Sequence, residues 1–201
     1  MKIEVLGHAS VKLTGKKVIY FDPYNIQVKL QDADYIFITH DHYDHYDLAS
    51  INNVKKDTTK IIVPTCLKDI DSDLVVEPNK HYIIDKLEFD TIRSYNIGKS
   101  FHPKEKDYVG YNVLLEDEFF YIMGDTDRTP ETEMVKCNYC FVPIGGTYTM
   151  NVVEAAEYIN DTHPDVAIPI HYGSITGSLL LADEFKERVN KDIKVEIKIG
   201  E

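Results

Sequence analysis

The chain has 201 residues, of which 43% are hydrophobic and 28% are charged, and its formal net charge is −12 at pH 7. These values are ordinary for a globular protein that is long enough to bury a sizeable core. The net negative charge disfavours binding to nucleic acid polymers or to anionic membranes, because both require a positive field.

Short apolar runs predict a series of strands through the first part of the chain. The expected strands span residues 2–6, 10–14, 17–21, 34–39, 60–63, 81–84, 87–95, 109–115 and 118–123. The polar segment Glu116-Asp117-Glu118 predicts a tight turn between the last two. This part of the chain is therefore expected to be rich in antiparallel pairs.

The pattern changes after residue 125, where helices are expected to alternate with strands. Helices are expected at 151–161 and 179–190, and strands at 140–144, 165–170 and 193–199. Asn151 is placed to cap the first helix, with Glu154 three positions later completing a capping box. Strands followed by alternating strand and helix predict sheets packed together with helices outside them.

The segment His40-Asp41-His42-Tyr43-Asp44-His45 places three of the eight histidines within six residues. It follows the apolar run 35–39, which is typical of a buried strand. A strand that ends in imidazoles and carboxylates brings these groups to a fixed point, as proteins do to bind divalent metals. The segment therefore predicts a metal site.

Other polar residues also follow predicted strands. Asp22 follows 18–21, Asp125 follows 119–124, His171 follows 166–170, and His102 lies in the loop before 109–115. Strand ends at one edge of a sheet bring the residues after them into one cleft, so these side chains are expected to converge on the histidine segment. The converging set would be His40, His42, Asp44, His45, His102, Asp125 and His171, and it suits two metals such as zinc, manganese or iron.

These motifs resemble the metallo-β-lactamase-fold hydrolases. The matching residues are the run at 40–45, His102, Gly124-Asp125-Thr126, Ile168-Pro169-Ile170-His171-Tyr172-Gly173 and Phe21-Asp22-Pro23. Gly7-His8-Ala9-Ser10, Phe101-His102-Pro103-Lys104 with Val109-Gly110-Tyr111, and Pro143-Ile144-Gly145-Gly146-Thr147-Tyr148 resemble one branch of that family. This branch contains small uncharacterised metal-dependent hydrolases and includes the ascorbate-6-phosphate lactonase group.

The resemblance implies an α/β fold, a four-layer αβ/βα sandwich formed by one domain over residues 1–201. It also implies the metal ligands. His40, His42 and His102 would bind one metal, Asp44, His45 and His171 would bind a second, and Asp125 would bridge them. Asp22 would accept a hydrogen bond from a ligand imidazole. His8 is expected to support the site or the sheet, because nothing in its spacing makes it a ligand.

The expected activity is hydrolysis of a small, phosphorylated or unphosphorylated metabolite by a hydroxide that bridges two divalent ions, with zinc foremost and manganese or iron as alternatives. Asp44 or Asp125 would orient the nucleophile. Lys104, Arg128, Tyr148 and Tyr172 are candidates for binding substrate, and the first two would suit an anionic group such as phosphate. The sequence does not decide between a phosphodiester, a lactone and another ester.

Two other functions compete with hydrolysis. Diiron redox proteins share this fold, but they typically have Glu where this chain has His42, and they usually use a flavin domain for which 201 residues leave no room. A non-catalytic binding protein on the same scaffold would be expected to have lost ligands, yet all seven are present. Cys137 and Cys140 form a lone Cys-x-x-Cys pair, which we interpret as structural.

The remaining expectations concern location and partners. The chain begins without the pattern of a signal peptide, shows no stretch long enough to span a membrane, and has three cysteines, an odd number. We therefore expect a cytoplasmic protein with a small-molecule substrate and with neither a membrane nor a nucleic acid partner. The sequence leaves the oligomeric state open, and a homo-oligomer would allow a neighbouring copy to complete the pocket.

Overall fold

The computed structural model describes residues 1–199 and contains two β-sheets. The first sheet has the spatial order β1 to β6. Its strands are β1 (Lys2–Gly7), β2 (Ser10–Thr14), β3 (Val18–Phe21), β4 (Ala33–Phe37), β5 (Lys55–Pro64) and β6 (Leu74–Val76). Pairing is antiparallel from β1 to β3 and parallel from β3 to β6. The carboxyl ends of β3 and β4 therefore lie at the same edge of this sheet.

The second sheet has the spatial order β13-β12-β11-β10-β9-β8-β7. Its strands are β7 (His81–Ile84), β8 (Leu87–Arg93), β9 (Val109–Leu115), β10 (Glu118–Ile122), β11 (Tyr139–Pro143), β12 (Val166–Ile170) and β13 (Lys194–Val195). Strands β7 to β10 pair antiparallel, whereas β10 to β13 pair parallel. The carboxyl ends of β10, β11 and β12 consequently lie together.

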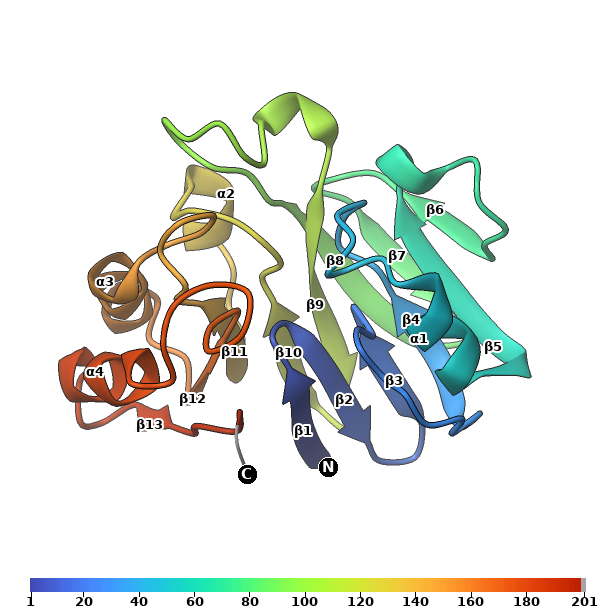
Figure 1. Ribbon diagram of the computed structural model, residues 1–201, viewed down its shortest axis with the longest axis horizontal. Helices are drawn as coiled ribbons and strands as arrows, with labels where there is room; N and C mark the ends of the chain where they lie inside the picture. Colours follow the sequence, from blue (N-terminus) through green and yellow to red (C-terminus); the bar gives the residue numbers. More distant parts are fainter. Residues whose placement is uncertain (200–201) are drawn as a thin grey trace.

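Three clusters of buried side chains hold four layers together. The largest lies between the sheets and includes Leu13 and Phe37 from the first and Phe120 and Ile168 from the second. A second cluster packs α3 (Val152–Thr162) and α4 (Leu181–Arg188) on the second sheet, and a third packs α1 (Leu48–Val54) on the first. Figure 1 shows these helices on the two outer sides of the sandwich. The four-layer fold predicted from the sequence is confirmed.

Most predicted elements are present, with differences at marginal ones. The capping box is confirmed, because the Asn151 side chain accepts from the backbone N–H of Glu154 and the Glu154 side chain accepts from that of Asn151. Three short elements were not expected from the sequence: α1, α2 (Pro130–Glu133) and β6, all of which have seven residues or fewer. The strand expected at 193–199 is reduced to β13.

Two hydrogen bonds join the sheets at the edge where the predicted site lies. Val109 donates its backbone N–H to the carbonyl of Thr39 at 3.1 Å, and the Tyr111 hydroxyl donates to the carbonyl of Ile38 at 2.8 Å. The ends of β4 and β9 are thereby fixed relative to each other. Within residues 1–199, no helix is long and apolar enough to cross a membrane.

Candidate metal centre

The side chains predicted to bind metal meet at the carboxyl ends of β4, β10 and β12 and in the loop before β9. Their ligand atoms form three overlapping groups, each within 4.8 Å. The groups are His40, His42 and His102; His8, Asp44, His45 and His171; and His40, His45 and Asp125. All seven predicted ligands therefore lie in one cluster, and His8 joins them.

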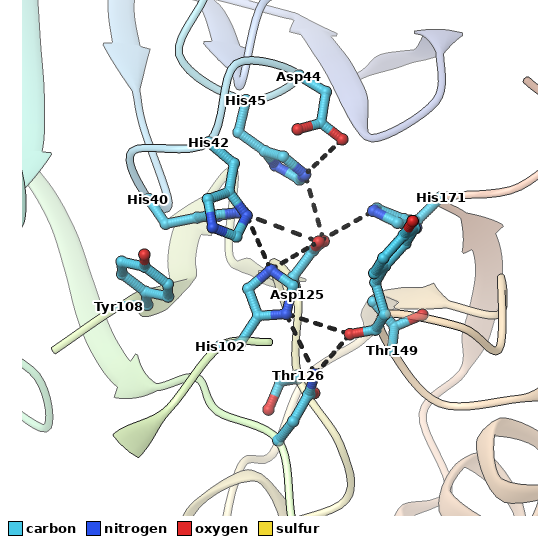
Figure 2. A network of polar contacts seen from close by, with 12 residues as sticks. His40, His42, Asp44, His45, His102, Tyr108, Asp125, Thr126, Thr149 and His171 are labelled. Atoms are coloured by element: carbon cyan, nitrogen blue, oxygen red, sulfur yellow. Dashed lines mark hydrogen bonds and ion pairs between the residues drawn. The ribbon is translucent and has the colours of Figure 1, made fainter. Parts of the chain in front are cut away.

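Asp125 lies at the middle of this cluster, with the histidines around its carboxylate (Figure 2). Asp125 Oδ2 lies 2.9 Å from His171 Nε2 and 3.2 Å from His102 Nε2, and Asp125 Oδ1 lies 3.3 Å from His45 Nε2. The carboxylate thus reaches imidazoles of both predicted ligand sets.

Several buried nitrogen and oxygen atoms of the cluster have no hydrogen-bond partner in the described part of the chain, as expected of atoms that bind a metal. His40 Nε2, His45 Nε2, His171 Nε2 and Asp125 Oδ1 are buried, and within residues 1–199 they have no hydrogen-bond partner. Buried polar atoms without partners are costly in a native structure. Imidazole nitrogens and carboxylate oxygens that converge without hydrogen-bond geometry are the donor set of a zinc-type metal site.

Asp22 holds His45 from behind. The His45 Nδ1–H donates to Asp22 Oδ2 at 2.7 Å, which leaves Nε2 directed at Asp125. Asp22 is itself fixed by Thr39, whose backbone N–H and hydroxyl donate to its two carboxylate oxygens at 2.7 and 2.6 Å. A carboxylate that fixes the tautomer and orientation of an imidazole is the usual support of a metal-binding histidine. This role of Asp22 was expected from the sequence, whereas the contribution of Thr39 was not.

His102 receives its support from a segment far away in the chain. Its Nδ1 lies 3.1 Å from the carbonyl oxygen of Tyr148, which also accepts from Asn96 Nδ2 at 2.6 Å. The Nε2 atom then faces His42 Nδ1 at 3.1 Å and Asp125. Asn96 was missed, because neither its spacing nor its surroundings in the sequence distinguish it from a loop residue.

Four of the site residues adopt left-handed backbone conformations. The φ angles are 51° at His8, 45° at Asp22, 56° at His102 and 58° at His171. Such angles are uncommon for residues other than glycine and concentrate at functional sites. Asp22 and His171 directly follow β3 and β12, so the left-handed residue turns the chain at the strand end and directs the side chain into the cluster.

Gly145 provides the space that His171 occupies. A Cβ atom at position 145 would collide with the carbonyl oxygen of His171 and the side chain of Thr176, and it would lie 3.2 Å from His171 Nδ1. Glycine is therefore the residue that permits this close approach of the segments after β11 and β12.

Burial and mutual proximity shift the pKa values of several groups in the cluster. Burial alone would raise the pKa of Asp125, but His171 and His45 hold it well below its usual range. Burial lowers the pKa of His40, and the neighbouring His45 lowers it further. For His45, burial opposes the charged form, but Asp125 and Asp22 raise its pKa well above the usual value. A metal that binds His45 Nε2 must therefore displace a proton.

His8 contacts one of the predicted ligands directly. Its Nε2 lies 3.0 Å from Asp44 Oδ2, and its backbone carbonyl accepts from the N–H of His171 at 2.8 Å. Hydrogen bonding to His8 and the proximity of His45 lower the pKa of Asp44, although burial opposes them. The ionised carboxylate can only accept, so His8 donates through Nε2–H. His8 therefore holds Asp44 through a hydrogen bond and also lies in one of the candidate ligand groups.

The four predicted substrate-binding residues do not share one location. Tyr148 lines the pocket at the cluster. Lys104 is bound by Glu131 at 2.9 Å and by the Tyr95 hydroxyl at 3.1 Å, and Arg128 is bound by Glu133 at 2.6 Å and Asp161 at 2.7 Å. Neither cation lines that pocket, so the expectation that they lie in the cleft is corrected. Both side chains pair instead with carboxylates of α2 and α3.

Tyr172 also does not line the pocket at the cluster. It is fully buried in the core cluster beneath α3 and α4, and it borders a separate cavity beside His8. Cys140 is buried in that same core cluster, with Cys137 packed against it, and both are free thiols. Within residues 1–199 neither cysteine belongs to a group that could hold a metal.

Comparison of the sequence with known proteins shows the family. A family model described as "Beta-lactamase superfamily domain" matches residues 2–171. The chain belongs to the beta-lactamase superfamily. A curated relative, a UPF0173 protein of Pyrococcus furiosus, is 32% identical over 197 residues, which cover 95% of this chain and 91% of the relative.

Another relative and a solved structure also match this chain over nearly its whole length. A UPF0173 metal-dependent hydrolase of Pyrococcus horikoshii is 31% identical, with 98% of this chain and 96% of the relative covered. A crystal structure from Parabacteroides distasonis superposes with a TM-score of 0.85 at 28% identity, and 98% of this chain and 91% of that one are covered. The chain is a metal-dependent hydrolase of this superfamily, with a His/Asp cluster able to bind metal.

Proposed function

We propose that the chain is a dinuclear metallohydrolase that cleaves an ester-type bond in a small molecule. The observation that carries this proposal is the division of the ligands into two sets with Asp125 between them. His40, His42 and His102 form one set and Asp44, His45 and His171 form the other, while the carboxylate of Asp125 lies within 3.3 Å of nitrogens from both.

Two divalent cations in these sets would polarise the scissile bond and supply a nucleophilic water at neutral pH. The residues of the chain fix where this chemistry takes place. Asp22 and the Tyr148 carbonyl orient His45 and His102, and His8 orients Asp44. Asp44 and Asp125 are acceptors that would align the water for attack. A set rich in imidazole favours zinc, with manganese and iron as alternatives.

The competing redox function is less well supported by the ligand set. Diiron redox members of the fold typically place a carboxylate where this chain has His42, and a carboxylate-poor set suits zinc hydrolysis better than oxygen chemistry. His42 lies 3.1 Å from His102, so position 42 faces its set as an imidazole.

Metal content tests the dinuclear assignment. Protein purified without added metal or chelator is analysed for metal per chain, then reconstituted with zinc or manganese and assayed on a bis-aryl phosphodiester and a simple lactone. Two metals per chain with hydrolysis of either substrate would support the proposal. One metal per chain in active enzyme would overturn the dinuclear assignment, and iron with oxygen-dependent turnover would favour the redox function.

Variants separate the two metal sets. His102→Ala should lose one metal and His171→Ala the other, because each removes a ligand from a different set. His81 serves as the matched control. It is exposed on β7, at the edge of the second sheet, and pairs with Asp90 of β8, so His81→Ala should keep both metals. Loss of both metals in each ligand variant, with a folded chain by circular dichroism, would show that the sets do not bind independently.

A further inference from the structure

A cavity of about 390 Å³ opens on the candidate metal cluster and is lined by five of its residues, His42, Asp44, His102, Asp125 and His171. This volume lies in the range of small-molecule sites. Five further residues, which are not candidate ligands themselves, complete the lining of this cavity. These wall residues are Asp41, Tyr43, Phe101, Tyr148 and Ile175. Because these side chains would contact the parts of a substrate beyond the scissile bond, they bear on substrate choice.

Four of the five wall residues are aromatic or aliphatic, and two of them are exposed beyond what their apolar character favours. Tyr43 is 67% exposed and Phe101 is 46% exposed. Phe101 contacts Tyr148 edge to face, with ring centroids 4.6 Å apart at 89°. Large apolar side chains gathered around a polar centre are typical of a surface that packs against an apolar ligand.

The walls also lack a cation. Among residues 1–199, no lysine or arginine lines this cavity. The loop before β9 contains Lys99, Lys104 and Lys106, none of which lines the cavity, and the first two are engaged elsewhere. Lys99 is bound by Asp127 and donates to the Thr149 carbonyl at 2.7 Å, and Lys104 is bound by Glu131.

Asp41 adds a carboxyl group to the wall of this cavity. Its carboxyl group accepts from the Tyr108 hydroxyl at 2.6 Å and faces the cavity without a basic partner. A substrate anion at this wall would meet a like charge instead of the Arg or Lys that usually recognises phosphate. The charge pattern therefore selects against a phosphorylated or carboxylated group beyond the scissile bond.

From these walls we infer that the substrate is an uncharged carboxylic ester or lactone with an aromatic or aliphatic group, which packs between Phe101, Tyr148 and Tyr43. This inference rests on the proposed hydrolysis and narrows it to one substrate class. The reaction adds the oxygen of water to the ester carbonyl carbon and breaks the carbon–oxygen bond to the leaving group. An ester gives a carboxylic acid and an alcohol, a lactone gives a single hydroxycarboxylic acid, and water is the only other reactant.

The test compares three substrates with one leaving group on zinc-loaded enzyme. They are 4-nitrophenyl benzoate, its analogue with a carboxylate at the far end of the benzoate ring, and bis(4-nitrophenyl) phosphate. The neutral ester should have a kcat/KM about tenfold or more above that of the carboxylate analogue. A preference for either anionic substrate would overturn the inference while leaving hydrolysis established.

A binding measurement separates the pocket from the chemistry. Benzanilide is an uncharged amide with the shape of the aryl ester, and its affinity for zinc-loaded protein is measured by calorimetry beside that of 4-carboxybenzanilide. The neutral amide should bind more tightly. Tighter binding of the neutral amide with no hydrolysis of any ester would uphold the pocket's preference and refute the proposed function. Equal binding, or none by either amide, would overturn the inference.

Variants assign the preference to the walls. Phe101→Ser should weaken benzanilide about fivefold, because one aromatic contact is lost. Ile97→Ser is the matched control, since Ile97 is 58% exposed in the same loop but does not line the cavity. Ile175→Lys places a cation on the wall and should shift the preference toward the carboxylate analogue. An unchanged preference in Ile175→Lys would show that the walls do not select charge.

Discussion

The imidazole of His45 and the carboxylate of Asp22 lie 2.7 Å apart, joined across the ends of two neighbouring parallel strands. Asp22 follows β3 and His45 lies in the loop after β4, so the parallel pairing brings them together. Because the Nδ1–H of His45 is engaged, Nε2 is directed at Asp125. The orientation of one candidate metal ligand is thus set by the parallel pairing of β3 and β4.

Asp22→Asn should weaken zinc binding by roughly 10- to 100-fold, because the amide is a poorer acceptor for His45 and loses the negative charge behind it. Zinc affinity is measured by competition with a chelator, beside urea unfolding of the metal-free chain. Asp32→Asn is the control, since Asp32 also pairs with Lys12 and Tyr20 but lies outside the cluster. Equal zinc affinity in the two variants would contradict the role of Asp22.

Gly145→Ala should displace His171, because the added methyl group meets the His171 backbone and the Thr176 side chain. The affinity for a metal at the ligand set that contains His171 should then fall about tenfold. The readouts are metal content per chain and Tm. Gly98→Ala separates this effect from backbone strain, because Gly98 has φ of 72° with open space around it. That control should lose about 1 kcal/mol of stability and no metal. Two tightly bound metals in Gly145→Ala would show that His171 tolerates the shift.

The convergence of the candidate metal ligands was predictable because all of them except His102 follow an apolar run or belong to one dense motif. His40, Asp125 and His171 all lie just beyond strand ends, and parallel strands bring such ends to one edge. Their partners were not predictable in the same way. The support of His102 is a backbone carbonyl 46 residues away, and a backbone group leaves no trace in the residue type.

Two of the residues expected to bind substrate, Lys104 and Arg128, were placed in the cleft wrongly. Lys104 stands two positions from His102, so proximity in the sequence favoured a place in the cleft. The structure instead has a 3-10 turn over Lys104–Lys106, from which the Lys104 side chain reaches Glu131 of α2. A long charged side chain pairs with the carboxylate that the tertiary fold brings near, and α2 was itself too short to predict.

Asp125→Ala should abolish activity and reduce metal content, because it removes the carboxylate that lies between the two ligand sets. Cys137→Ser should leave both near normal, since Cys137 packs against the core beneath α3 and takes part in no candidate metal group within residues 1–199. Metal analysis and ester hydrolysis are measured on both variants. A Cys137→Ser enzyme that lost metal would overturn the structural interpretation of the Cys-x-x-Cys pair.

The metal-free chain should lose stability as the pH falls from 6.0 to 5.0. Burial and the neighbouring His45 hold the pKa of His40 well below its usual value of 6.5, so in this window the unfolded chain binds a proton that the folded chain does not. Stability then rises with pH and is complete above the unfolded pKa. One such proton changes the free energy of unfolding by at most about 1.4 kcal/mol per pH unit.

His45 acts in the opposite sense but outside this window. Its pKa is raised by Asp125 and Asp22 against the effect of burial, so near pH 5 it is protonated in both the folded and the unfolded chain and contributes little. Urea unfolding of metal-free wild type and His40→Asn at pH 6.0 and 5.0 measures the difference. The variant should show the shallower dependence on pH. Equal slopes in the two proteins would mean that His40 is not held neutral by the fold.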